Sequence, residues 1–307
     1  MAYYTVAHLL QGGNDNLTGR QTGPIGIKAE DMNDAVWEYV FKRGAYPADC
    51  KIPEELIYKL RYEFEYWYPL DLRCSGKDLI RNHLTMALYN HAAVWDNDAK
   101  MMPRGFFCNG YVLVNGEKMS KSKGNFMTIR DCIERYGVDA TRVAIADAGD
   151  TLDDANFDEL VANSAILKLF VFERWIFEEL RKSVPEGGLD FSKQPEMDLW
   201  DELFQNEINY SIESTTRSYD EIKYKQALKH CFFEPMTIKE DYLIGKGAKG
   251  ANPFLLIRFI ETQLILLNPI IPHFAEYCWE MHVRPVLEKS TNLSKKPAER
   301  LINQGWP

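Results

Sequence analysis

The spacing of apolar residues changes along the chain and divides it into two parts. In the first part, short apolar stretches alternate with glycine and proline. The pattern predicts a helix over residues 54–67, stopped by Pro69, and then a short strand over residues 70–74. A glycine turn leads into a helix ending near residue 94, and a second strand-like stretch covers residues 106–114. This order predicts a βαβ unit of a parallel α/β sheet, whose ligands bind beyond the carboxyl ends of the strands.

After residue 150 the strand signals fade and the apolar spacing becomes helical. One helix face collects six apolar positions, namely Val161, Ala165, Leu169, Phe172, Ile176 and Leu180. Further helices are predicted over residues 198–218, 219–233 and 252–267, with a loop over residues 245–250 and a polar tail over residues 287–300. We therefore expect an α/β domain with a partial Rossmann-type parallel sheet over residues 1–148, followed by an all-α helical bundle domain over residues 149–307.

Composition and charge narrow the possible functions. With 46% apolar and 26% charged residues, the chain of 307 residues is expected to fold, and its length suggests two domains. The net charge of −9 argues against a small nucleic-acid module that binds through an overall basic field. Six scattered cysteines without a C-x-x-C pair predict reduced, cytosolic thiols. The apolar run at residues 2–10 is too short to span a membrane and lacks a leader's features, so we expect a cytoplasmic protein, and its abrupt start suggests a piece of a longer chain.

Residues 116–125, G-E-K-M-S-K-S-K-G-N, carry the most informative chemistry. Three lysines and two serines lie between two glycines, which predicts a mobile loop. Clustered lysines suit a polyanion, because they stabilise the charge that grows on phosphate oxygens during phosphoryl or nucleotidyl transfer. A solvated basic turn is the alternative. The S-x-x-K spacing also occurs in serine penicillin-binding enzymes, but no K-T-G follows, and a P-loop motif is absent.

The string at residues 118–122 is identified as the KMSKS signature of class I aminoacyl-tRNA synthetases, in full consensus form. This resemblance implies that Lys118 and Lys121 hold ATP phosphates, with Met119, Ser120 and Ser122 in the same ATP-binding loop. The preceding N-G-Y-V segment is similar to the strand and turn that lie against adenine in the family, which implies ATP-binding roles for Asn109 and Gly110. A buried strand with a glycine bulge is the alternative for those two residues.

A second segment resembles leucyl-tRNA synthetases of the eukaryotic and archaeal branch. Y-W-Y-P at residues 66–69 is followed by S-G-K-D-L-I-R-N-H-L at residues 75–84. The resemblance implies that Gly76 and Asp78 bind ATP and that Tyr66, Tyr68 and His83 line the leucine pocket. Taken alone, Asp78 is equally well a cap or first-turn acid of a helix, and His83 a core histidine.

Further segments extend this resemblance to leucyl-tRNA synthetases over the chain. They are M-A-Y-Y-T-V-A-H-L-L-Q-G-G at the start, A-D-A-G-D-T at residues 146–151 with D-A-N-F at residues 154–157, and L-L-N-P at residues 266–269 with Pro272-His273. The resemblance implies leucine–tRNA ligase activity with ATP and Mg²⁺, and leucine and tRNA(Leu) as substrates. We assign no residue of the chain to a metal.

The chain has no H-x-G-H, the other signature of a class I site. We therefore expect it to carry part of the active site, to be inactive alone, and to act with the missing N-terminal catalytic half or in a multi-synthetase assembly. The alternative is a non-catalytic RNA- or protein-binding derivative. Basic helix residues, among them Lys168 and Lys225, are more simply explained as solvated faces.

Overall fold

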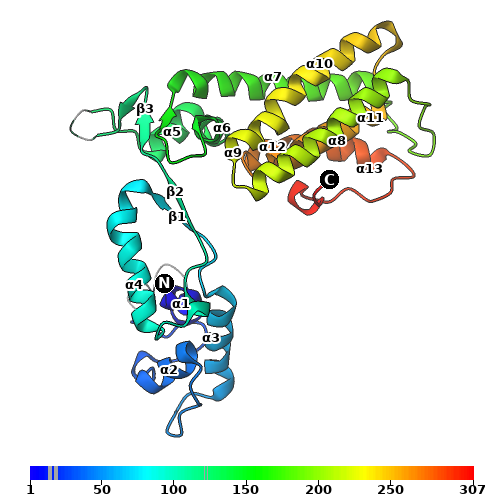
Figure 1. The fold of residues 1–307 in the computed structure, drawn as a ribbon. Coiled ribbons are helices and arrows are strands. Elements are labelled where there is room, and N and C mark those ends of the chain that lie inside the picture. The colour runs from blue at the N-terminus through cyan, green and yellow to red at the C-terminus, as the bar shows by residue number, and fades with distance from the viewer. Residues whose placement is uncertain (13–15, 17–19, 121, 123) are drawn as a thin grey trace. The chain divides into compact units, whose positions relative to one another are not determined.

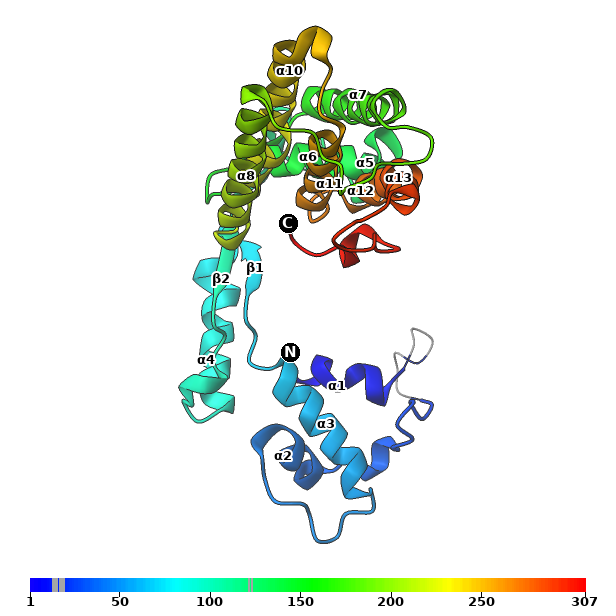
Figure 2. The ribbon, with the colours of Figure 1, turned by 90° about the vertical axis from the view of Figure 1, so that its right-hand side faces the viewer.

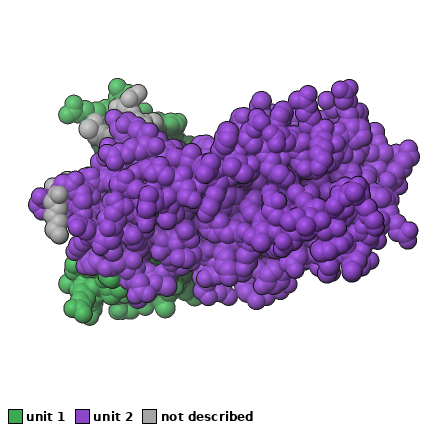
Figure 3. Space-filling view, turned by 90° about the horizontal axis from the view of Figure 1, so that it is seen from above, with its two compact units in different colours: residues 1–108 green, residues 109–307 purple. Residues whose placement is uncertain are grey.

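The structure is a computed structural model that describes residues 1–12, 16, 20–120, 122 and 124–307. The chain divides into two compact units, which are unit 1 (Met1–Cys108) and unit 2 (Asn109–Pro307) (Figures 1 and 3). The predicted boundary at residue 148 lies inside unit 2 and stays a prediction. Among the described residues, no helix is long and apolar enough to cross a membrane.

Unit 1 is built around three helices, α1 (Ala2–Leu10), α2 (Asp34–Lys42) and α3 (Glu54–Trp67). Helix α3 has the predicted bounds. Its apolar face buries Ile57, Leu60 and Phe64 in the core of the unit. The strand β1 (Arg73–Gly76) begins three residues later than predicted, and α4 (Thr85–Val94) follows it after a 3-10 turn (Lys77–Leu79) and a π-helical turn (Ile80–Leu84).

The prediction of one strand over residues 106–114 is wrong. The stretch is broken at Gly110 into β2 (Phe106–Asn109), which pairs with β1, and β3 (Val112–Val114), which belongs to a different sheet. A Cβ atom on Gly110 would lie 2.1 Å from the backbone oxygen of Asp153. The backbone therefore approaches Gly110 too closely for any side chain at this position.

Strand β3 pairs in parallel with β5 (Ala155–Phe157), with Leu113 opposite Asn156. On its other side, β3 pairs antiparallel with the short β4 (Glu117–Lys118). Strand β5 was not predicted, because three residues are too few to show an alternating pattern. It places a sheet strand after residue 150, where only helices were expected.

The rest of unit 2 is helical (Figures 1 and 2). After α5 (Ile129–Tyr136) and α6 (Val138–Ala148) come the long α7 (Glu159–Ser183) and α8 (Leu199–Asp220). They are followed by α9 (Tyr224–Leu228), α10 (Glu234–Lys246), α11 (Pro253–Leu267), α12 (Pro272–Cys278) and α13 (Arg284–Lys289). The expected fold class, an α/β part followed by a helical bundle, is confirmed.

The core of the bundle forms where the sequence pattern placed it. Five of the six predicted positions on α7 are buried, and Val161 is half-buried. Helix α11 is buried on nearly all sides, and its central residues, such as Ile260 and Leu264, are fully enclosed. Both ends of the predicted helix over residues 219–233 were wrong. It begins only at Tyr224, because α8 continues to Asp220 and the chain turns at Ile222, whose φ is 59°. It also continues past Phe233 through a π-helical turn (Lys229–Phe233) into α10.

Candidate active site

A tight hairpin presents the lysine-containing loop at residues 116–125. Asn115 and Gly116 join β3 to β4 with φ values of 50° and 82°, the left-handed pair that an Asn-Gly turn adopts. The Gly116 N–H donates to Oδ1 of Asn156 on β5, at 2.6 Å. The parallel strand that the sequence did not reveal thus fixes the start of the loop.

Within the loop, the described side chains lie close together. Lys118, at the end of β4, holds its Nζ 4.0 Å from the ring centroid of Tyr111. The hydroxyl oxygens of Ser120 and Ser122 lie 2.8 Å apart, and Asn125 hydrogen-bonds to the backbone on both sides of Met119. A ring face attracts an ammonium group without neutralising it. Lys121, the second predicted catalytic lysine, lies outside the described residues.

A side-chain pair joins this hairpin to the helical part of unit 2. Nδ2 of Asn115 donates to Oε1 of Glu159 at 3.1 Å, and the Glu159 N–H donates to Oδ1 of Asn115 at 3.2 Å. The Tyr136 hydroxyl donates to the other carboxylate oxygen of Glu159 at 2.6 Å. Because Glu159 is the first residue of α7, the start of this helix is tied directly to the turn that carries the loop.

These hydrogen bonds, first from Tyr136 and then from Asn115, hold the pKa of Glu159 below its ordinary value of 4.5. A carboxyl whose folded-state pKa is lowered contributes stability above its unfolded pKa and loses it as the pH falls through the folded value. We expect the free energy of unfolding to fall with pH below about 4.5 and to fall less steeply in Glu159→Gln, as measured by urea denaturation. Glu178→Gln, on an exposed part of the same helix, is the control and should keep the wild-type slope. An unchanged slope in Glu159→Gln would contradict the assigned pKa shift.

The other predicted ATP-binding residues lie at the ends of strands β1 and β2 or directly after them. The Asn109 side chain donates to the Gly110 carbonyl at 2.8 Å, and Gly110 packs on the backbone of Asp153. The close approach gives Gly110 a packing role whether or not it also faces a nucleotide. Asp78 lies in the first turn of the 3-10 helix after β1, and a Cβ atom on Gly76 would lie 2.7 Å from its Oδ1. The structure therefore brings Gly76 and Asp78 together at the end of a strand.

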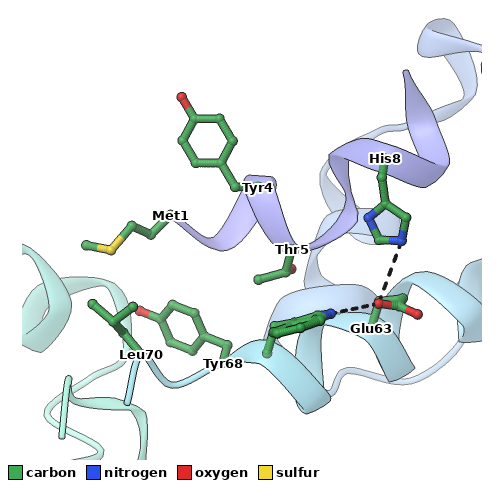
Figure 4. Close-up of a pocket in the computed structure, with 8 residues that line it drawn as sticks. Met1, Tyr4, Thr5, His8, Glu63, Tyr68 and Leu70 are labelled. Carbon is green, nitrogen blue, oxygen red and sulfur yellow. Dashed lines mark hydrogen bonds and ion pairs between the residues drawn. The ribbon is translucent and has the colours of Figure 1, made fainter. Parts of the chain in front are cut away.

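An open pocket of about 660 Å³ lies between α1 and α3 in unit 1 (Figure 4). It is lined by Met1, Tyr4, Thr5, His8, Glu63, Trp67, Tyr68 and Leu70. Oε2 of Glu63 accepts a hydrogen bond from Trp67 Nε1 at 3.0 Å and lies 3.7 Å from His8 Nε2. The pocket thus combines aromatic walls with one carboxylate.

Of the three predicted leucine-pocket residues, only Tyr68 lines this pocket. It is largely buried, and its hydroxyl accepts a hydrogen bond from Trp95 Nε1 at 2.9 Å. Tyr66 is exposed and lies outside the lining. His83 is also exposed and hydrogen-bonds to Arg73, so it is not the core histidine of the alternative interpretation.

The pocket residues that α1 and α3 supply were not predicted from the sequence. Tyr4 and His8 are four residues apart and therefore share a face of α1, and Glu63 faces them from α3. The helical spacing was visible in the sequence. The pairing of α1 with α3, which turns that spacing into a pocket, was not.

Two family models match the chain. Residues 59–162 match the class I (C) catalytic domain of tRNA synthetases, and residues 201–307 match the anticodon-binding domain of tRNA ligases. The first match contains the lysine loop, and the second contains most of the bundle. The chain belongs to the class I aminoacyl-tRNA synthetases.

Within that family, similarity over the whole chain is to cytoplasmic leucine–tRNA ligases. The chain is 43% identical over 279 residues to the putative cytoplasmic leucine–tRNA ligase of Schizosaccharomyces pombe, which covers 91% of this chain and 24% of that protein. It is 41% identical over 309 residues to the cytoplasmic leucine–tRNA ligase of Arabidopsis thaliana, and this alignment covers 100% of this chain and 26% of that protein. The chain therefore spans about a quarter of the length of these relatives.

Two solved structures share the fold. Agrobacterium radiobacter K84 LeuRS, in a ternary complex with tRNA and LeuAMS, superposes with a TM-score of 0.59 at 17% identity, over 94% of this chain and 33% of that one. Mycobacterium tuberculosis methionyl-tRNA synthetase bound by methionyl-adenylate gives a TM-score of 0.58 at 18% identity, over 71% of this chain and 45% of that one. At these identities the superpositions support the fold.

Proposed function

We propose that the chain provides the lysine-loop part of a leucine–tRNA ligase active site together with the helical domain that binds tRNA(Leu). The observation that carries this proposal is a consensus KMSKS loop, held on a hairpin, in a chain about 40% identical over its length to cytoplasmic leucine–tRNA ligases. In the proposed reaction, the leucine carboxylate attacks the α-phosphorus of ATP, and pyrophosphate leaves. The leucyl group then passes from the adenylate to tRNA(Leu), and AMP leaves. We place this reaction in the cytoplasm, in line with the names of the relatives.

Lys118 and Lys121 are the proposed catalytic residues. Their charges stabilise the phosphate oxygens, where negative charge grows as pyrophosphate departs. Lys118 lies over the face of Tyr111, which attracts the ammonium group but leaves its charge available. Lys121 is assigned from its place in the motif. Mg²⁺ would be held by the ATP phosphates, water and at most one or two carboxylates, as is usual for this ion. The described residues hold no group of three or more His, Cys, Asp or Glu suited to a metal.

The pocket between α1 and α3 is the proposed site for leucine. Its aromatic walls suit a branched aliphatic side chain, and the Glu63 carboxylate supplies the negative charge that the amino group of a free amino acid needs. Of the residues assigned from sequence, Tyr68 contributes to this pocket directly. Tyr66 and His83 lie outside the lining of this pocket. A role for either residue in leucine binding requires that it contact leucine from outside the pocket lining.

The exposed apolar residues of helix α4 favour the presence of an additional polypeptide in the complete site. It is apolar around most of its circumference, yet Met86, Tyr89 and Val94 are exposed. A helix that is apolar on all sides is normally buried on all sides. The proposed covering polypeptide is the remaining part of a class I catalytic domain, since the chain spans about a quarter of its relatives.

The test is amino-acid-dependent ATP–pyrophosphate exchange by the chain mixed with a polypeptide that supplies the preceding part of a relative's catalytic domain. We expect exchange that depends on leucine and is weak with the other amino acids. Mixtures lacking either polypeptide are the controls. Absence of exchange with every amino acid, in a mixture shown to be folded by circular dichroism, would favour a non-catalytic RNA- or protein-binding derivative.

A further inference from the structure

The side-chain amide of Asn125 hydrogen-bonds to the backbone of the lysine loop at two residues, Lys118 and Ser120. Its Oδ1 accepts a hydrogen bond from the Ser120 N–H at 2.9 Å, and its Nδ2 donates to the Lys118 carbonyl at 3.1 Å. One side chain therefore pairs with backbone groups on both sides of Met119. No other residue type of this length offers a donor and an acceptor on one planar group.

These contacts fix the segment whose lysine carries the proposed chemistry. The start of the loop is already held by Asn156, and its end by the capping box of α5, in which Thr128 and Asp131 bond reciprocally. Between these anchors, the described side-chain bonds to the backbone of residues 117–124 both come from Asn125. The β3–β4 ladder holds Lys118 opposite Leu113. Beyond this ladder, the Asn125 amide is the described side chain that fixes the backbone from Lys118 to Ser120.

We propose that Asn125 is a positioning residue for the lysine loop, which sets the direction of the Lys118 side chain toward ATP through two backbone hydrogen bonds. The role in ATP binding rests on the proposed function, whereas the two hydrogen bonds do not. Asn125 itself need not touch the nucleotide. A displacement of about 1 Å in a reacting geometry can cost about a hundredfold in rate, so a loose loop should weaken catalysis more than folding.

The first experiment measures hydrogen exchange of the Ser120 amide in the full chain, with no ligand or partner present. Asn125→Ala should speed exchange at Ser120 by about tenfold, because the amide loses its acceptor. Asn125→Asp keeps an oxygen at the same place and should preserve protection at Ser120 while losing the bond to the Lys118 carbonyl. Asn163→Ala is the matched control, because the Asn163 amide bonds only to its own helix at the Glu159 carbonyl among the contacts described.

The second experiment measures leucine-dependent exchange in the two-polypeptide mixture. Asn125→Ala should lower kcat about thirtyfold and leave the KM for leucine within about twofold, because the chemistry step depends on the loop and leucine binding does not. Asn163→Ala should match the wild type in both values.

The outcomes separate the two proposals. Unchanged Ser120 exchange in Asn125→Ala, or wild-type kcat with leucine-dependent activity present, would overturn the positioning role. The wild-type mixture could show no ATP–pyrophosphate exchange with any amino acid while the Ser120 amide loses protection in Asn125→Ala. In that case the proposed function is wrong, and the two hydrogen bonds of Asn125 remain a structural feature of the loop.

Discussion

Lys118→Ala should lower leucine-dependent ATP–pyrophosphate exchange about a hundredfold. The Lys118 ammonium group lies at the end of β4, 4.0 Å from the Tyr111 ring, and among the described residues no carboxylate forms an ion pair with it. Loss of one preorganised charge that acts on the transition state costs about 3 kcal/mol in the barrier. Because the phosphate charge grows during the reaction, kcat should fall more than the affinity for ATP.

The control for this substitution is Lys59→Ala, which removes an exposed lysine from α3. It should leave kcat and both KM values within about twofold of the wild type. Lys118→Arg keeps the charge but changes its shape, and it should recover part of the lost rate. Near-normal exchange by Lys118→Ala would remove the catalytic role proposed for this residue. Lys121→Ala tests the second lysine in the same assay.

Much of the helical fold was predictable because its signals are local. Helix α3 has the predicted bounds, since a proline precedes it and Pro69 follows it. The buried face of α7 matches the predicted one because the apolar residues repeat with the period of a helix over several turns. Such patterns need no knowledge of what the helix packs against.

The sheet was harder to predict because strand pairing depends on distant residues. Nothing local distinguishes residues 112–114 from residues 106–109, yet they belong to different sheets. The break between them comes from the Asp153 backbone, which lies more than forty residues along the chain from Gly110. The partner of β3 is the three-residue strand β5, too short to show an alternating pattern.

The sequence also revealed some residues of the candidate active site and not others. The lysine loop could be found from its residue string. Its hairpin turn was not predicted, although Asn115-Gly116 is a residue pair typical of such a turn. By contrast, the functions of Asn125, Asn156 and Glu159 depend on which backbone groups they reach in the folded chain. Polar side chains of this kind look like ordinary surface residues in a sequence, because their spacing carries no period.

The ion-pair cluster joining α8 and α10 should account for the largest stability effect of a single charge in unit 2. Lys246 Nζ lies 2.8 Å from Oδ2 of Asp198 and 3.0 Å from Oδ2 of Asp201. The Tyr242 hydroxyl donates to the other oxygen of Asp201, at 2.6 Å. The side chains of Lys246 and Asp201 are only 8% and 4% exposed, so water cannot replace a lost partner. Burial alone would lower the pKa of Lys246, but its hydrogen bonds to the two carboxylates outweigh burial and raise that pKa.

Lys246→Met should therefore lower the free energy of unfolding by about 3 kcal/mol, because it leaves the Asp201 carboxylate buried without a cation. The measurement is urea denaturation, followed by hydrogen exchange at the α8 amides to place the loss in unit 2. Lys249→Met, which removes an exposed lysine three residues away, should change stability by less than about 0.5 kcal/mol. Adding Asp201→Asn to Lys246→Met removes the stranded charge and should restore part of the loss, which makes the two substitutions strongly non-additive. If Lys246→Met is as stable as Lys249→Met, the cluster contributes specificity of packing between α8 and α10 rather than net stability.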